Sequence, residues 1–197
     1  MPISLAVGSH IDSRSPMSAI CRRCTSFGGA LLALATFSAP AQQPSLRAPN
    51  VVEISSQLVT SGQPSAEALA GLGALGFGAV IYLAPPTVLD AVRDEALIVA
   101  RQGLVFVNIP IRFDNPTEKD FEAFAGALRG LAGRKVLVHC QVNLRASSMV
   151  FLYRSIVAKD DPRVAYDSVT RVWAPDGPWK KLIQEQLKKH RIDFDPL

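Results

Sequence analysis

A cysteine and an arginine stand at the two ends of a short loop within Lys135 to Val157, KVLVHCQVNLRASSMVFLYRSIV. Four residues separate Cys140 from Arg145. A thiolate is a strong nucleophile, and a guanidinium group can bind two oxygens of a phosphate or sulfonate at once. The pair therefore predicts group-transfer chemistry on an oxyanion.

The residues on either side of this loop predict a strand that runs into a helix. Residues 135–138 form a short apolar run rich in β-branched side chains, and residues 146–157 carry apolar side chains at helical spacing. At such a junction the N–H groups of the turn lack intrahelical partners, and the positive end of the helix dipole lies behind them. We expect these groups to favour the thiolate form of Cys140.

The residues predicted to bind the oxyanion are those of the loop itself. Their backbone N–H groups and the Arg145 guanidinium are expected to make the contacts. The binding residues are Gln141, Val142, Asn143, Leu144 and Arg145. Asparagine is among the non-glycine residues that best tolerate a positive φ, so Asn143 allows the loop to turn without a glycine.

Apolar strands alternate with helices along the chain, which predicts an α/β fold. The runs at 79–83, 104–109 and 135–138 are apolar throughout, as in strands that are buried on both faces. The expected fold has three layers, with a mostly parallel central sheet and helices on both faces. Ligands in such folds bind beyond the carboxyl ends of the strands, where the loop at 139–145 emerges.

Capping residues set the expected helix boundaries. Ser65 is expected to cap a helix over 66–75, and Asp90 a second helix that runs through Arg101. Thr117 is expected to open a third helix, with Asp120 in its first turn. The remaining elements expected are strands at 51–54 and 58–60, and helical segments at 146–157, from 161 and at 178–189.

The first 41 residues predict a secretory signal peptide. Arg22 and Arg23 form a positive region, residues 27–37 a short apolar core, and Ala39-Pro40-Ala41 a small-x-small cleavage site. The apolar core is too short for an anchor, so we expect no stable membrane insertion after cleavage. The prediction is an exported, periplasmic protein with a flexible lead at 42–50 and a single domain at 51–197. Twin-arginine export stays open as the route.

The composition fits one globular domain, since the 197 residues are 48% hydrophobic and 19% charged. Without residues 1–41 the chain has 18 basic and 16 acidic side chains, and a net charge of +2 does not predict nucleic-acid binding. Cys140 is then the single cysteine, so it is either a buried inert side chain or a reactive free thiol. We find no metal-ligand spacing and predict no metal and no other cofactor.

The order His-Cys, loop, Arg resembles the signature of cysteine-dependent phosphatases of the tyrosine and dual-specificity type. Those enzymes keep five residues between Cys and Arg, whereas rhodanese-type sulfurtransferases and a small bacterial phosphatase-like group keep four, as here. The chain resembles that bacterial group along roughly residues 50 to 190. The matching stretches, in order, are Ser61-Gly62-Gln63-Pro64-Ser65, Val80-Ile81-Tyr82-Leu83, Asn115-Pro116-Thr117, and VHCQVNLRAS followed by Phe151-Leu152-Tyr153-Arg154.

The resemblance implies a proton donor, since these phosphatases use an Asp on a loop upstream of the cysteine. Asp114 lies 26 residues before Cys140, on the loop after the strand at 104–109, and is the first candidate. Asp120 is the second, although its place in a first helical turn suits capping better.

Two further residues are expected to support the site. His139 leaves the strand on the side away from the thiol, and we expect it to order the loop through a hydrogen bond to the backbone. In the resembled enzymes the residue after the arginine bonds the thiolate. Ala146 stands there in this chain, so Ser147 carries the hydroxyl one position later.

Three functions are consistent with these residues. The first is hydrolysis of phosphomonoesters, of protein phosphotyrosine or of a small compound, through a phosphocysteine intermediate. The second is sulfur transfer through a persulfide of Cys140, and the third is non-catalytic binding of an anion or partner. The expected ligand is a phosphorylated substrate or small oxyanion, and the oligomeric state stays open.

Overall fold

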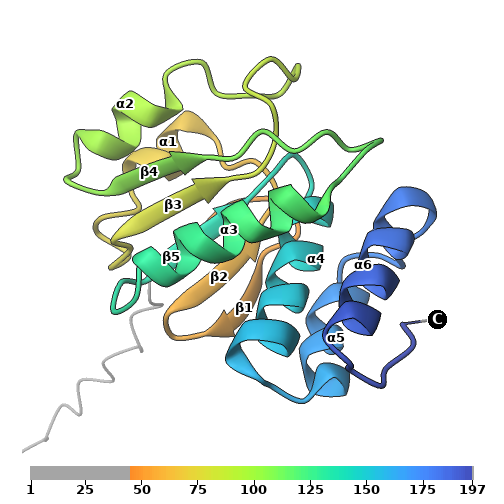
Figure 1. The fold of residues 1–197 in the computed structure, drawn as a ribbon. Helices are drawn as coiled ribbons and strands as arrows, with labels where there is room; N and C mark the ends of the chain where they lie inside the picture. The colour runs from red at the N-terminus through yellow and green to blue at the C-terminus, as the bar shows by residue number, and fades with distance from the viewer. Residues whose placement is uncertain (1–44, 197) are drawn as a thin grey trace, which may run out of the picture. The chain divides into compact units, whose positions relative to one another are not determined.

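The computed structural model describes residues 45–196, so the predicted signal peptide lies outside the described residues. Figure 1 shows the elements. The strands are β1 (Val52–Ser55), β2 (Leu58–Ser61), β3 (Ala79–Tyr82), β4 (Val105–Asn108) and β5 (Val136–His139). The helices are α1 (Ala66–Ala70), α2 (Glu95–Ala100), α3 (Glu118–Gly130), α4 (Leu144–Tyr153), α5 (Pro162–Thr170) and α6 (Gly177–Lys189), and a π-helical segment, Arg154–Ala158, continues α4.

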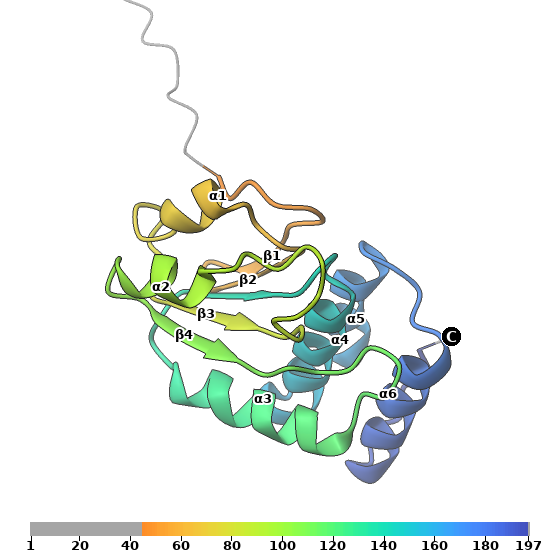
Figure 2. The ribbon, with the colours of Figure 1, turned by 90° about the horizontal axis from the view of Figure 1, so that it is seen from above.

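Helices cover both faces of the sheet. Helices α1 and α2 lie on one face, and α3 to α6 lie on the other (Figure 2). The buried side chains form two clusters, because successive strand residues point to opposite faces. One cluster contains Leu69, Leu72, Val99, Val80 and Leu137, and the other contains Phe124, Phe151, Ile183, Ile81 and Val138.

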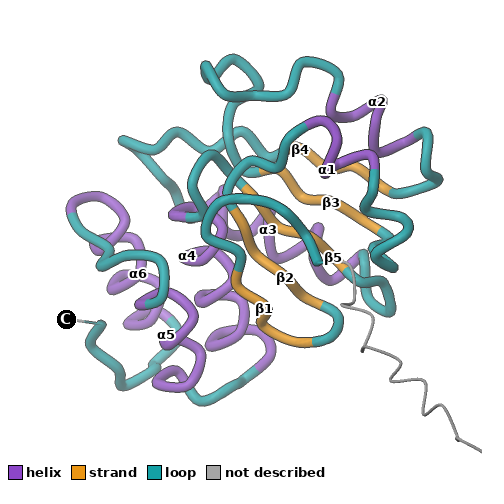
Figure 3. Tube along the Cα trace, turned by 180° about the vertical axis from the view of Figure 1, so that it is seen from behind, coloured by secondary structure: helices purple, strands orange, loops and turns teal. Residues whose placement is uncertain are grey.

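The five strands form one mixed sheet in the order β1-β2-β5-β3-β4 (Figure 3). Strand β1 is antiparallel to β2, and the other neighbouring pairs are parallel. In the central strand β5, His139 is in register with Ser61 of β2 and Tyr82 of β3. The predicted fold class is therefore confirmed, and the carboxyl ends of the parallel strands meet beside Cys140.

Local capping signals place several helix ends where the sequence predicts them. The Ser65 side chain accepts a hydrogen bond from the Ala68 N–H. Thr117 and Asp120 form a capping box, in which the Asp120 carboxylate accepts from the Thr117 N–H at 2.7 Å. This contact supports the capping role expected for Asp120. Gly133, with a φ of 81°, follows the end of α3.

Two predicted helices are shorter than expected. The helix predicted to follow Asp90 and run through Arg101 is wrong in its first turn, because residues 85–94 form turns and irregular structure and α2 begins at Glu95. Asp90 therefore caps no helix, and its carboxylate instead accepts a hydrogen bond from Gln141 Nε2. The helix predicted over 66–75 ends at Ala70, where Gly71 lowers the helix propensity.

Candidate active site

Cys140 and Arg145 lie on the loop that joins the central strand to α4. Cys140 directly follows β5, and its side chain is fully buried. Arg145 is the second residue of α4, whose N-cap is Asn143. The helix begins two residues earlier than predicted, so it places Arg145 in its first turn.

The backbone N–H groups of this loop are unpaired. Within residues 45–196, the N–H groups of residues 141–145 donate to no other protein atom. The carbonyl groups are engaged instead: that of Gln141 accepts from the Gln63 N–H at 2.9 Å, and that of Val142 from Asn50 Nδ2 at 3.0 Å. Free donors at the start of a ten-residue helix are the arrangement that binds an anion.

Gly62 allows a neighbouring segment to approach the loop closely. It forms an isolated antiparallel bridge with Val142. A Cβ atom at this position would lie 2.8 Å from the Gln141 carbonyl oxygen, so a larger residue would displace the loop. The stretch Ser61-Gly62-Gln63-Pro64, which carried part of the family resemblance, thus shapes the cysteine loop directly.

Asn143 provides the left-handed turn of the loop, as predicted. Its φ is 73°, and it is fully buried. Its Nδ2 donates to the Asn50 carbonyl at 2.6 Å and to Thr60 Oγ1 at 3.0 Å. Asn50 belongs to the lead whose flexibility stays a prediction, and its contacts join that segment to the site.

We expect Asn143→Ala to destabilise the protein more than Asn143→Gly. Both changes remove the two side-chain hydrogen bonds, but only alanine adds the steric cost of a positive φ. The expected difference in the free energy of unfolding is about 1 kcal/mol. Urea denaturation of both variants measures it, and equal midpoints would show that φ is relaxed at this position.

The Arg145 guanidinium is fixed by the loop that follows β4. Its Nε donates to the Ile111 carbonyl at 3.0 Å, and one terminal nitrogen donates to Gln141 Oε1 at 3.3 Å. The Phe113 ring lies 5.1 Å from the guanidinium carbon. Two of the five N–H donors are used, so three are available for an oxyanion.

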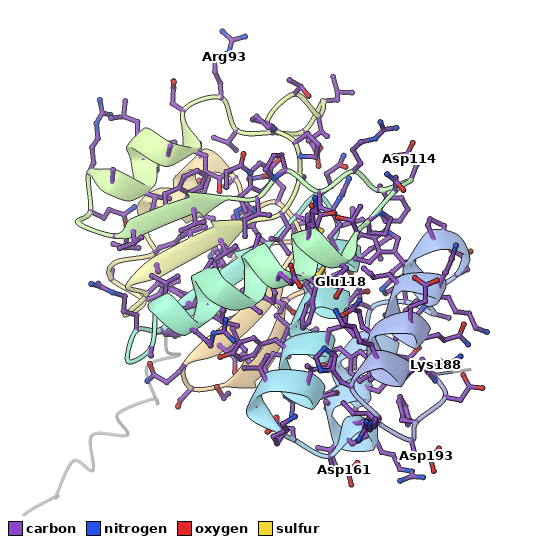
Figure 4. All side chains as sticks on the ribbon, in the orientation of Figure 1. Arg93, Asp114, Glu118, Asp161, Lys188 and Asp193 are labelled. Atoms are coloured by element: carbon purple, nitrogen blue, oxygen red, sulfur yellow. The ribbon has the colours of Figure 1, made fainter. Side chains whose placement is uncertain are left out.

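Asp114 lies on this same loop, as the sequence predicted, but its carboxylate binds Arg112. The two oxygens accept from Arg112 Nε at 3.1 Å and from a terminal nitrogen at 2.7 Å, and both side chains are 70% exposed. Figure 4 shows Asp114 at the tip of the loop between β4 and α3. The hydrogen bonds from Arg112 lower the pKa of Asp114, which favours the ionised form over a proton donor. The acid role of Asp114 stays a prediction.

His139 has a side-chain partner that the sequence did not reveal. A hydrogen bond to the backbone was expected, but Nε2 lies 2.6 Å from Glu95 Oε1, without the alignment of a hydrogen bond. Both side chains are buried. The other Glu95 oxygen accepts from Gln63 Nε2 at 2.9 Å, and the Tyr82 ring stacks on the imidazole at 4.8 Å. Glu95 thereby links α2 to the residue before Cys140.

Replacing Glu95 is expected to destabilise the fold. Removing one partner of a buried pair leaves the other without compensation. We expect Glu95→Ala to lower the free energy of unfolding by about 3 kcal/mol, as measured by urea denaturation. Glu67, in the first turn of α1, is the matched control because it is exposed, and Glu67→Ala should change stability far less.

Two other predicted site residues, Ser147 and Val142, lie within the helix and at the rim of the loop, respectively. The Ser147 hydroxyl donates to the Leu144 carbonyl at 3.2 Å, so its hydrogen is used within the helix. Its predicted bond to the thiolate stays a prediction. Val142 is 46% exposed at the rim of the loop.

Within residues 45–196, no group of three or more His, Cys, Asp or Glu side chains is placed to hold a metal ion. In the same range no helix is long and apolar enough to cross a membrane.

A cysteine and an arginine around unpaired amides, at the carboxyl end of the central strand, define a cysteine-phosphatase-like α/β domain. The chain belongs to the family described as DSP-PTPase phosphatase fused to NAD+ kinase, whose model matches residues 33–185. The family of cysteine-dependent phosphatases expected from the sequence is thus confirmed.

Two curated relatives are similar to this chain over part of their length. Both are beta-lactamase hydrolase-like proteins of Xylella fastidiosa, from strains Temecula1 and 9a5c. Each is 30% identical, over 157 and 123 residues, which are 74% and 60% of this chain. The chain spans 35% and 27% of the length of these relatives.

Solved structures share the fold. A candidate phosphatase (DUF442) from Shewanella putrefaciens CN-32 has a TM-score of 0.67 and 31% identity, with 73% of this chain and 92% of that chain covered. Tk-PTP in its active form has a TM-score of 0.58 at 23% identity, with 74% and 99% covered. PTPMT1 has a TM-score of 0.58 at 17% identity, with 72% and 96% covered, and these two show the fold alone.

Proposed function

We propose that this protein hydrolyses phosphomonoesters, with Cys140 as the nucleophile and Arg145 as the oxyanion ligand. The observation that carries the proposal is the set of unpaired N–H groups at residues 141–145, directly after a cysteine and beside a fixed guanidinium. These donors match the equatorial oxygens of a phosphoryl group, whose charge they stabilise during transfer. Family membership supports the same chemistry.

In the proposed first step, the Cys140 thiolate attacks phosphorus and the bond to the ester oxygen breaks. The electron pair of that bond stays on the leaving oxygen, which takes a proton from a carboxylic acid. Water then attacks the phosphocysteine, the S–P bond breaks, and its electron pair returns to sulfur. Inorganic phosphate is released, and the proton from water restores the acid.

The substrate of this reaction is proposed as protein phosphotyrosine or a small phosphorylated compound. Export and a periplasmic location remain proposals that rest on residues 1–41, and the lead at 42–50 and the domain boundary at 51 remain predictions. N-terminal sequencing of the protein purified from the producing cell tests the predicted cleavage of the signal peptide, because cleavage after Ala41 leaves Gln42 as the first residue.

Sulfur transfer is the second candidate, because four residues between Cys140 and Arg145 also fit a rhodanese-type loop. In that reaction the thiolate takes the outer sulfur of thiosulfate and releases sulfite. Cyanide then removes the sulfur as thiocyanate and regenerates the thiolate.

Two assays of the same purified protein separate these functions. We expect release of p-nitrophenol from p-nitrophenyl phosphate and no thiocyanate from thiosulfate plus cyanide. Formation of thiocyanate alone would reject the phosphatase proposal. If neither product forms and Cys140→Ser changes nothing that is measured, non-catalytic binding is favoured, and isothermal titration with inorganic phosphate tests for an anion site.

A further inference from the structure

Asp90 lies at the mouth of the cysteine loop, although it comes from another part of the chain. It belongs to the segment between β3 and α2, 51 residues from its partner Gln141. Gln141 Nε2 donates to Asp90 Oδ1 at 2.8 Å, and Gln141 Oε1 accepts from Arg145 at 3.3 Å. One amide side chain thus joins the Asp90 carboxylate to the oxyanion ligand.

The pKa of the Tyr82 hydroxyl is a second indication that Asp90 lies near Cys140. Burial raises the pKa of the Tyr82 hydroxyl, and the charges of Glu95, Asp90 and Cys140 raise it further, whereas the charge of Arg145 lowers it. The Asp90 carboxylate and Cys140 are therefore both close enough to the Tyr82 hydroxyl to raise its pKa. Asp114 is not among these charges.

The two carboxylates differ in what binds them. Asp114 is held by a guanidinium through two hydrogen bonds, and a cation on both oxygens opposes protonation. Asp90 is exposed and accepts from a neutral amide on one oxygen. Within the described residues no side chain is hydrogen-bonded to its other oxygen.

We propose that Asp90 is the catalytic acid that protonates the leaving oxygen of the phosphomonoester. This inference rests on the proposed phosphatase function. As the P–O bond breaks, the Asp90 O–H bond breaks with it, and the proton passes to the leaving alcohol or phenol. In the second step the Asp90 carboxylate takes a proton from the attacking water.

Leaving groups of different basicity test this role. A good leaving group departs as its anion, whereas a poor one needs the proton. In the full chain, Asp90→Asn is expected to lower kcat/KM, which reports the steps up to departure of the leaving group, about 100-fold for phenyl phosphate and less than about 3-fold for p-nitrophenyl phosphate. Asp90→Glu, which keeps the carboxyl group, should restore part of the activity on phenyl phosphate.

Asp94 provides the matched control, because it is an exposed aspartate of the same segment and its side chain makes no cap hydrogen bond. Asp94→Asn should keep both activities. Equal loss of kcat/KM on both substrates in Asp90→Asn would mean that Asp90 only holds Gln141 in place, which overturns the acid role. A selective loss in Asp114→Asn without one in Asp90→Asn also overturns it.

Cys140→Ser in the same assay separates failure of this inference from failure of the proposed function. Activity that disappears in Cys140→Ser but persists in Asp90→Asn on phenyl phosphate rejects Asp90 alone. Wild-type protein that hydrolyses neither ester, or Cys140→Ser that hydrolyses both, rejects the phosphatase function and Asp90 as its acid.

Discussion

Replacing Cys140 with serine is expected to abolish phosphomonoester hydrolysis, lowering kcat by about 10⁴-fold or more. Serine keeps the shape of the side chain, but its hydroxyl stays protonated at neutral pH, and the described residues place no base on it. The unpaired amides of residues 141–145 remain, so binding of inorganic phosphate should persist. Steady-state kinetics and phosphate titration of the same preparation measure the two effects.

A rapid-quench experiment with ³²P-labelled substrate tests the covalent step. Label is expected on Cys140 in the wild-type protein and on no residue in Cys140→Ser. A wild-type protein that hydrolyses the ester without ever carrying label would contradict the phosphocysteine intermediate.

Most of the scaffold could be predicted because its signals are local. The runs at 79–83 and 135–138 are apolar on both faces, and both form parallel strands of the central sheet. Asn143 adopts the positive φ that its side chain tolerates, and Thr117 and Asp120 form the expected capping box. Residue type and short spacing decide each of these features, so the sequence alone was sufficient.

The partners of the site residues could not be predicted in the same way. Glu95 lies in the first turn of a helix, where a carboxylate is usually exposed and stabilised by the dipole, yet packing buries it against His139. Asp90 has the residue type of a helix cap but bonds Gln141, 51 residues away. Such contacts join residues that are far apart in the sequence and become neighbours only when the sheet forms. The spacing of residues along the chain therefore does not predict them.

Arg145→Lys is expected to lower kcat/KM for p-nitrophenyl phosphate by about 100-fold to 1000-fold, although the positive charge is kept. Lysine cannot bond the Ile111 carbonyl, Gln141 and two phosphate oxygens at the same time. The loss should fall mainly on kcat, because the charge on the equatorial oxygens is best matched by the planar guanidinium as the phosphoryl group transfers.

Arg154→Lys is the matched control for this change. Arg154 follows α4 directly, pairs with Asp160 at 2.7 Å and lies at the far end of the helix from the cysteine loop. It should lose little activity, since its guanidinium serves a partly exposed ion pair. Thermal unfolding of both variants distinguishes a catalytic loss from a folding defect. If Arg145→Lys folds normally and keeps wild-type kcat/KM, the two-pronged contact of the guanidinium with phosphate is not used, and a point charge is sufficient at this site.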